Sequence, residues 1–407
     1  MATYYVSKAG NDSNDGLTPA AAKLTINSAL TSASTSGDVV EIIDEGTYNE
    51  GGLWNRAANI TIKHTASWLG RPIVDGTGLG SGEAFHIYYD RYQIIGLEMT
   101  NQASYAFKGS GGANVANDFQ VSGCFIHNVP ILASGDITNT DISNPTTFKQ
   151  CIMFFEPGSD DVITINGYAE ISNCLITASN LSAGNSIILD SSTRGTASFN
   201  TIIDRGAAAT DPTVLCAKVI NNIVWSNSTA EGAAGIASDD QTYNLVVVGG
   251  ASNAFRNKAD DANAATGSNA LATKAGLGFV NADSVGNRAS TADDFQLTEG
   301  ARPIGFGVTY DSITVDLTGT TRPQGDDWDV GCFEFVSTPP EWTSYTTQNN
   351  LNLKQDFTIT TFQNSLDSSN HKFKYGQSVR IMPFHFGLKG PMNLRCPGRD
   401  KPYKVEK

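Results

Sequence analysis

Gly123-Cys-Phe-Ile126, Gln150-Cys-Ile-Met153 and Asn173-Cys-Leu-Ile176 are three copies of one short pattern, in which a Gly, Gln or Asn precedes three mostly apolar residues. The chain holds seven copies, with leading positions 27, 27, 23, 27, 22 and 22 residues apart: Gly96-Leu-Glu-Met99, Gly123-Cys-Phe-Ile126, Gln150-Cys-Ile-Met153, Asn173-Cys-Leu-Ile176, Asn200-Thr-Ile-Ile203, Asn222-Ile-Val-Trp225 and Asn244-Leu-Val-Val247. Asn and Gly tolerate the left-handed backbone that a sharp bend needs. Each copy therefore predicts two short strands joined by a bend.

A repeat of this period indicates a solenoid. Leucine-rich repeats have a similar period, but they need a helix and a Leu signature that are absent here. A stack of strand-built coils fits better, with loops of unequal length leaving the coil wherever the spacing varies.

Both ends of this region carry further motifs, namely Tyr4-Tyr-Val-Ser-Lys-Ala-Gly-Asn-Asp-Ser-Asn-Asp-Gly16, Leu24-Thr-Ile-Asn-Ser-Ala29, Asp294-Phe-Gln-Leu297, Arg322-Pro-Gln-Gly-Asp326 and Asp329-Val-Gly-Cys-Phe-Glu-Phe335. With these motifs, the chain resembles the right-handed parallel β-helix family of pectate-lyase-like proteins and phage tailspikes over about residues 3–336. The resemblance implies an all-β fold, a single-stranded right-handed parallel β-helix with an N-terminal capping helix. Many unrelated functions use this scaffold, so the fold alone indicates no chemistry.

A capping helix is also expected on physical grounds, because an open stack of coils exposes its terminal strand edge. We place it at about residues 25–35, with Thr25 as N-cap. Its apolar stripe at helical spacing is Ile26, Ala29, Leu30 and Ala33.

The chain changes character after residue 336. Ser337-Thr-Pro-Pro340 predicts a linker at 337–340. Residues 341–407 contain ten Lys/Arg and five Asp/Glu, whereas the other 340 residues carry 17 Lys/Arg and 36 Asp/Glu. We predict a basic, β-rich C-terminal module there that serves as an anchor or in oligomerisation.

Composition excludes several partners. The net charge of −14 argues against nucleic-acid binding. No stretch approaches 18 apolar residues, so we expect no membrane insertion. The first residues, Met-Ala-Thr-Tyr-Tyr-Val, show no secretory signal, which favours either a trimmed signal or a protein used without export.

Six scattered cysteines without a CxxC pair predict no zinc or redox motif. Cys124, Cys151 and Cys174 hold the same place in successive copies, so we expect them to stack in one column as free thiols.

Candidate catalytic residues are few. By resemblance, polysaccharide lyases on this scaffold use a Lys or Arg base beside a calcium ion held by acids. The positions after the bend hold no acid cluster. The one charged group there is Asp204-Arg205, with Asp190 and Arg194 upstream. A solvated surface ion pair is the alternative interpretation of these residues. Asp160 and Asp161 with Glu156 could supply two carboxyls for glycan hydrolysis, or form a simple turn.

Binding-site candidates are mostly aromatic. Tyr88, Tyr89 and Tyr92 could stack on sugars, as could Trp54 and Trp68, although coil packing explains them equally well. No histidine pair has metal-ligand spacing, so no metal site and no cofactor are predicted. Calcium at Asn11-Asp-Ser-Asn-Asp-Gly16 is the weaker alternative to an Asx turn.

The strand after each bend is apolar at almost every position, so at least one outward column must be apolar. Such a stripe exceeds what a soluble monomer exposes, so another subunit, a long loop or the tail must cover it. We expect a homotrimer interface built from the third residue after each leader: Met99, Ile126, Met153, Ile176, Ile203, Trp225 and Val247.

Together these features favour a phage virion surface protein, a tailspike or capsid decoration, that contacts a host surface glycan as a homotrimer. Its C-terminal module would bind other virion proteins. The alternatives are a secreted, extracellular polysaccharide lyase or glycan hydrolase, and a purely structural capsid-decorating protein.

Overall fold

The computed structural model describes residues 1–64, 70–80, 82–109, 117–133, 137–155, 161–179, 186–190, 194–205, 213–226, 236–237, 240–248, 270–271, 273–283, 289–310, 313–337, 393–394 and 403–404. The chain divides into two compact units, Met1–Pro339 and Pro340–Lys407. In the second unit the described elements are β30 (Asn393–Leu394) and β31 (Tyr403–Lys404), which pair antiparallel. The basic, β-rich character and the anchoring role of residues 341–407 stay predictions.

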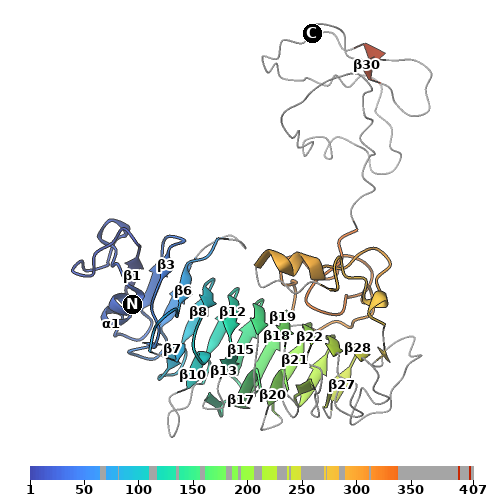
Figure 1. Cartoon of the computed structure of the whole chain (residues 1–407), viewed down its shortest axis with the longest axis horizontal. Helices are drawn as coiled ribbons and strands as arrows, with labels where there is room; N and C mark the ends of the chain where they lie inside the picture. The colour runs from blue at the N-terminus through green and yellow to red at the C-terminus, as the bar shows by residue number, and fades with distance from the viewer. Residues whose placement is uncertain are drawn as a thin grey trace. The chain divides into compact units, whose positions relative to one another are not determined.

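Three parallel sheets build the first unit, and the chain visits them in turn on each coil (Figure 1). Sheet A contains β1 (Thr3–Val6), β2 (Val39–Ile42), β5 (Thr61–Lys63), β8 (Gln93–Ile95), β11 (Gln120–Ser122), β15 (Thr146–Lys149), β18 (Ala169–Ser172), β21 (Thr196–Ser198), β24 (Lys218–Ile220) and β27 (Asp240–Thr242). Sheet B contains β3 (Thr47–Tyr48), β6 (Ile73–Asp75), β9 (Glu98–Thr100), β12 (Phe125–Val129), β16 (Ile152–Phe155), β19 (Leu175–Ala178), β22 (Thr201–Asp204), β25 (Ile223–Ser226), β28 (Leu245–Val248) and β29 (Ala270–Leu271). Sheet C contains β4 (Leu53–Trp54), β7 (Glu83–Ile87), β10 (Tyr105–Gly109), β13 (Ile131–Ala133), β17 (Ile163–Gly167), β20 (Ile188–Asp190), β23 (Val214–Leu215) and β26 (Ile236–Ala237), while β14 (Thr138–Asn139) pairs with β17. The right-handed parallel β-helix predicted from the sequence is confirmed.

The N-terminal end is capped by α1 (Ile26–Ser32), which is shorter than the predicted 25–35. The Thr25 hydroxyl accepts a hydrogen bond from the Ser28 amide at 3.2 Å, as an N-cap does. The Glu50 carboxylate accepts from the next two free amides, those of Ile26 at 2.9 Å and Asn27 at 2.8 Å. The predicted apolar stripe is confirmed, because its four side chains are fully buried in the core: Ile26, Ala29, Leu30 and Ala33. Short 3-10 helices lie at Pro19–Ala21, Ala275–Leu277 and Ala289–Phe295.

A single residue with positive φ turns the chain from sheet A into sheet B on successive coils: Gly96, Gly123, Gln150, Asn173, Phe199, Asn221 and Tyr243. These bend residues coincide with the predicted leaders in the first four copies. In the last three copies the bend lies one residue before the predicted leader. The register confirms the slip, since Leu175 pairs with Thr201 rather than with Ile202.

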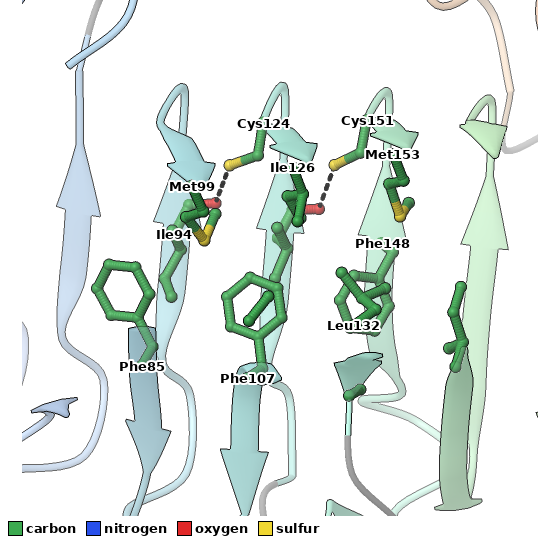
Figure 2. Close-up of a cluster of buried hydrophobic side chains, with 14 of the residues drawn as sticks. Phe85, Ile94, Met99, Phe107, Cys124, Ile126, Leu132, Phe148, Cys151 and Met153 are labelled. Atoms are coloured by element: carbon green, nitrogen blue, oxygen red, sulfur yellow. Dashed lines mark hydrogen bonds between the residues drawn. The ribbon is translucent and has the colours of Figure 1, made fainter. Parts of the chain in front are cut away.

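The structure corrects the predicted homotrimer interface, the column formed by the third residue after each leader. Met99, Ile126, Met153 and Ile176 point into the coil and are fully buried in its core (Figure 2 shows the first three). Ile203, Trp225 and Val247 belong instead to a second cluster on the outer face of sheet B. The seven residues therefore do not form one outward stripe, and the predicted interface is wrong.

The outer face of sheet B is mostly apolar between β16 and β28, and a later part of the same chain covers it. The covering segment comprises the described residues of 273–335. Its apolar side chains pack against those of sheet B in one buried cluster, which contains Phe125, Ile152, Phe154, Leu175, Ile203, Ile223, Trp225, Leu245 and Val247 from the sheet and Leu277, Phe279, Phe295, Leu317, Val330, Cys332 and Phe333 from the segment. A long segment within the chain thus accounts for the apolar surface from which the homotrimer was predicted.

Polar side chains of the bend residues hold the covering segment in place. The Gln150 amide donates to the Asp316 carbonyl at 2.9 Å, and the Asn173 amide donates to the Val315 carbonyl. Asn221 donates to the Val308 carbonyl at 2.7 Å and accepts from the Val308 amide at 3.0 Å. The bends therefore also bind the cover.

Arg322 fastens the covering segment at its centre. Its side chain is fully buried, forms an ion pair with Glu334 at 2.9 Å and lies 4.6 Å from the Phe199 ring centroid. It also donates to the Gly331 carbonyl at 2.8 Å and to Asn173 Oδ1 at 3.3 Å. Burial lowers the pKa of Arg322, and the negative charge of Glu334 opposes this shift. Removing either partner would leave a buried charge without compensation.

Candidate functional site

An exposed aromatic cluster lies on sheet C and the turn after it. Trp54 and Tyr88 are 5.8 Å apart between ring centroids, and Tyr88 and Tyr89 are 5.0 Å apart. Tyr88 and Tyr89 are each 40% exposed. The Arg56 guanidinium lies 3.4 Å from the Trp54 ring centroid. Three rings and one cation thus form a continuous surface, as predicted in part from Tyr88, Tyr89 and Trp54.

The turn that carries the two tyrosines is fixed from beneath by Asn55. This side chain is fully buried. Its Oδ1 accepts from the Tyr88 amide at 2.9 Å and the Tyr89 amide at 3.2 Å, and its Nδ2 donates to the Tyr89 carbonyl at 2.8 Å. Because a buried amide holds the backbone, the two rings are displayed in a set orientation.

Tyr92 does not belong to this surface. Its side chain is fully buried and packs against Phe85 and Phe119, with centroid separations of 6.3 and 6.4 Å. Burial raises the pKa of its phenol well above the usual range. The prediction that Tyr92 contacts glycan is wrong, because this residue begins the return into the core. Trp68 lies outside the described residues.

The structure separates the predicted catalytic pair. Asp204 is fully buried and accepts from Ser226 Oγ at 3.0 Å and Thr213 Oγ1 at 3.4 Å. Its register partner Ala178 is a core residue, so Asp204 faces the coil interior. Arg205 lies 5.8 Å from the Trp225 ring on the outer face. Asp204 and Arg205 are therefore not a solvated ion pair.

Of the other predicted catalytic residues, the structure describes the side chains of Arg194 and Asp161. Arg194 is exposed and lies 5.4 Å from the Tyr168 ring centroid. Asp161 accepts from the Ser186 amide at 2.5 Å. The side chain of Asp190, and Asp160 and Glu156 altogether, lie outside the described residues.

The Asn11–Gly16 loop forms the predicted Asx turn. Asn11 Oδ1 accepts from the Ser13 amide at 3.0 Å. The Lys23 ammonium group donates to the Asp12 and Asn14 carbonyls, at 3.3 and 2.8 Å. A protein cation therefore binds the carbonyls of this loop. Among the described residues, no group of three or more His, Cys, Asp or Glu side chains is placed to hold a metal ion.

A second polar cluster, not predicted from the sequence, lies on the outer face of β9 and β12. His127 Nε2 is 2.9 Å from Glu98 Oε1, and His127 Nδ1 is 3.4 Å from Thr100 Oγ1. The imidazole ring stacks on Phe125 at 4.3 Å between centroids. The Glu98 and His127 side chains are 23% and 13% exposed. An acid, an imidazole and a hydroxyl are thus hydrogen-bonded in a row, with the acid and the imidazole partly exposed and the hydroxyl of Thr100 buried beneath them.

Amide side chains border this row. Asn128 has a φ of 52°, at a bulge in β12, and its Nδ2 lies 3.5 Å from Thr100 Oγ1 and 3.4 Å from Asn101 Oδ1. Asn101 in turn donates to Asp75 Oδ1 at 3.0 Å. Burial raises the pKa of Asp75, but hydrogen bonds from Thr77 and Asn101 outweigh it and lower the pKa overall.

Comparing one equivalent position of the repeats at a time does not reveal this cluster. Thr100 and His127 are register partners in neighbouring strands, whereas Glu98 lies two residues before Thr100 on the same face. The contact between Glu98 and His127 is therefore diagonal. This cluster could have been predicted from one signal in the sequence, an acid two residues before the register partner of a histidine.

In comparisons with known proteins, neither a family model nor a curated protein matches the chain. Among solved structures, pectate lyase Pel9A is similar at a TM-score of 0.46 and 16% identity, covering 82% of this chain and 96% of that chain. The lacto-N-biosidase GH136 from Eubacterium ramulus gives 0.37 and 12%, covering 67% and 68%, and the pectin methylesterase from Aspergillus niger gives 0.35 and 12%, covering 71% and 88%. The fold rests on the sheet order described above rather than on these similarities.

Proposed function

We propose that this chain is a glycan-binding β-helix protein that holds sugar rings against Trp54, Tyr88 and Tyr89. The observation that carries the proposal is the continuous arrangement of three rings, in which Tyr88 and Tyr89 are exposed on a turn fixed by the buried Asn55 and Trp54 lies half-buried beside them in β4. Tyr and Trp combine an apolar face with a polar edge, which suits the mixed apolar and hydroxyl surface of a sugar. Arg56 adds a cation beside the rings, which favours an acidic glycan.

The setting that we propose for this binding is the surface of a phage virion, with a host surface glycan as ligand and the C-terminal unit as anchor. It follows from the resemblance to phage tailspikes in the sequence. The homotrimer remains part of this proposal, although the apolar stripe no longer supports it. Multi-angle light scattering of the full-length chain tests the trimer directly.

A panel of acidic and neutral oligosaccharides tests glycan binding, by isothermal titration calorimetry. For a ligand that binds, we expect Trp54→Ala to weaken binding roughly tenfold, since a ring contact of about 1–1.5 kcal/mol corresponds to about a tenfold change in Kd. Tyr88→Phe with Tyr89→Phe keeps both ring faces and should retain most of the affinity. Tyr5→Ala, at a partly exposed tyrosine of sheet A, is the matched control. Absence of binding across the panel, or equal affinity of Trp54→Ala and the unmodified protein, would reject the proposal.

A further inference from the structure

We propose that Glu98, His127 and Thr100 form an acyl-transfer site on the outer face of sheet B, with small carboxylic esters, such as acetylated hydroxyl groups, as substrates. This activity goes beyond glycan binding and depends on different residues from the aromatic cluster. The order of the hydrogen bonds, the rigidity of the three side chains and a neighbouring amide support it.

The three groups are hydrogen-bonded in the order acid, imidazole, hydroxyl. Glu98 Oε1 lies 2.9 Å from His127 Nε2, so the neutral imidazole is oriented with Nε2–H donating to the carboxylate. Nδ1 then presents its lone pair to the hydroxyl of Thr100, 3.4 Å away. An acid that orients a base, and a base beside a hydroxyl, is the arrangement that activates a nucleophile.

The rigidity of the three side chains strengthens this assignment. The His127 ring is held flat on Phe125, with an interplanar angle of 16°. Thr100 is 6% exposed, and a β-branched side chain in a strand has few accessible rotamers. Register pairing of Thr100 with His127 sets the distance between nucleophile and base through the sheet itself.

An amide donor lies beside the hydroxyl. Asn128 Nδ2 lies 3.5 Å from Thr100 Oγ1. When a carbonyl carbon bonds to this oxygen, its own oxygen comes within reach of the same amide, which can then stabilise the developing negative charge. Asn101 and Asn128 are exposed, so an ester can approach from solvent.

The reaction then balances as follows. Thr100 Oγ1 attacks the ester carbonyl carbon while its proton moves to His127 Nδ1. The carbon–oxygen bond to the alcohol breaks, and His127 returns the proton to the departing alcohol. Water, deprotonated by His127, attacks the acyl-threonine, and the Thr100 oxygen leaves with that proton. One ester and one water give one acid and one alcohol, with no other reactant.

A comparison within the chain supplies a matched control. His86 Nδ1 lies 3.2 Å from Glu83 Oε1 in β7, which gives a second acid–imidazole pair that is partly exposed. Within the described residues, the hydrogen bonding of the His86 ring is to Glu83 alone, without a hydroxyl. The two pairs therefore differ in the presence of the nucleophile.

The experiment uses the full-length chain and 4-nitrophenyl acetate, with an acetylated polysaccharide as a second probe. We expect hydrolysis, and a kcat lowered by roughly 10³-fold or more in Thr100→Val and His127→Gln. Thr100→Ser should retain activity, and His86→Gln should leave the rate unchanged. Glu98 is a positioning residue, so Glu98→Gln should lower kcat with little change in KM, and Glu98→Asp should restore part of the rate.

A covalent readout separates a structural role from the proposed one. Rapid acid quenching and peptide mass spectrometry should find one added acetyl group on Thr100, and none in Thr100→Val. Each variant is compared with the unmodified protein by circular dichroism to establish that it is folded. Absence of hydrolysis of both probes, an equal rate in Thr100→Val, or acetylation at another residue would each overturn the proposal. Trp54→Ala should hydrolyse 4-nitrophenyl acetate at the unmodified rate, so failure of glycan binding and failure of this site are distinguishable.

Discussion

Cys124, Cys151 and Cys174 occupy one interior column, and each thiol donates to a carbonyl of the preceding coil. The acceptors are the carbonyls of Ile94, Val121 and Phe148, at 3.8, 3.8 and 3.5 Å (the first two are drawn in Figure 2). All three cysteines are free and buried, as the sequence predicted. Burial raises the pKa of Cys124 and Cys151 well above the usual range, so these two are thiols rather than reactive thiolates at neutral pH.

We expect the folded protein to resist iodoacetamide at these three cysteines and the unfolded protein to react at all of them without reductant. Peptide mass spectrometry after labelling in the absence and presence of denaturant measures both states. Val336→Cys, at a position 49% exposed, gives a thiol that should react in the folded state. A Cys124–Cys151 bridge, or rapid labelling of the folded column, would contradict the expectation.

Asp44 joins the first strands at the capped end. Its carboxylate accepts from Ser7 Oγ at 2.8 Å, the Lys8 amide at 2.6 Å, Tyr48 Oη at 2.8 Å and the Gly46 amide at 3.0 Å. Burial raises the pKa of Asp44, but these hydrogen bonds outweigh it and lower the pKa overall. A lowered pKa means that the ionised form stabilises the fold.

Stability from Asp44 is therefore present above the unfolded pKa of the carboxyl and is lost as the pH falls through its lower folded pKa. Asp44→Asn should lower the melting temperature by roughly 2–4 °C at pH 7, on the basis of about 1 kcal/mol in a domain of this size. The deficit should shrink as the pH falls below about 4. Thermal melts of both proteins from pH 7 to pH 3 measure it. A constant or growing deficit in acid would show that Asp44 does not act through its charge.

After β19, the interior column formed by Cys124, Cys151 and Cys174 continues with asparagine side chains. Asn222 is fully buried; its Oδ1 accepts from the backbone amide of Asn200 at 2.9 Å, and its Nδ2 donates to Asn244 Oδ1 at 3.1 Å. Its Nδ2 also donates to the Ala197 and Ile220 carbonyls, both at 2.9 Å. One side chain thus satisfies groups on three consecutive coils.

Asn222→Ala should lower the free energy of unfolding by about 2–5 kcal/mol, because it leaves several buried polar groups without partners at about 1–3 kcal/mol each. Guanidinium unfolding followed by circular dichroism measures the change. Asn281→Ala, at an exposed position, should change stability by less than about 0.5 kcal/mol. Equal stability of the two variants would show that the ladder does not stabilise the stack.

The same asparagines illustrate which features of the fold the sequence could predict and which it could not. The period, the all-parallel coils and the cap helix follow from Gly/Asn bends and apolar spacing, because both are local properties. The one-residue slip at Phe199 does not, since Asn suits a left-handed bend, as at Asn173, and equally a buried ladder, as at Asn200. The predicted interface failed because the third residue after the bend faces the core in the first four copies, and the shift of one residue reverses the faces in the last three.

The candidate sites were predictable to a similar extent. Exposed aromatic residues beside a turn are visible in the sequence, and Tyr88 and Tyr89 lie as expected. Tyr92 lies four residues beyond Tyr88 but returns to the core, because the turn length sets its face. Glu98 and His127 lie in neighbouring coils and are offset by two residues. Aligning the repeats in columns shows register partners only, so it does not reveal this diagonal contact.

For the whole molecule, the covering segment is the feature that keeps the apolar face of sheet B from solvent. A chain ending at Val336 retains this segment and should stay soluble with the β-helix intact. A chain ending at residue 272 lacks it and should aggregate, because it exposes the sheet B side chains of the buried cluster. Size-exclusion chromatography with light scattering compares the two. A soluble, monodisperse chain ending at residue 272 would contradict this role of the segment.

From the contacts of the covering segment we also expect an order in which the chain folds. Its contacts join residues far apart in sequence, 166 residues for Gln150 with Asp316, 149 for Asn173 with Arg322 and 131 for Thr201 with Cys332. Coil-to-coil register pairs span 22 to 36 residues, so we expect the stack to grow as the chain emerges and the cover to dock last. At about 5–20 residues per second, synthesis of residues 248–336 takes roughly 5–20 s. During that interval the nascent chain displays an uncovered apolar face on the ribosome, and we expect chaperone demand to concentrate there.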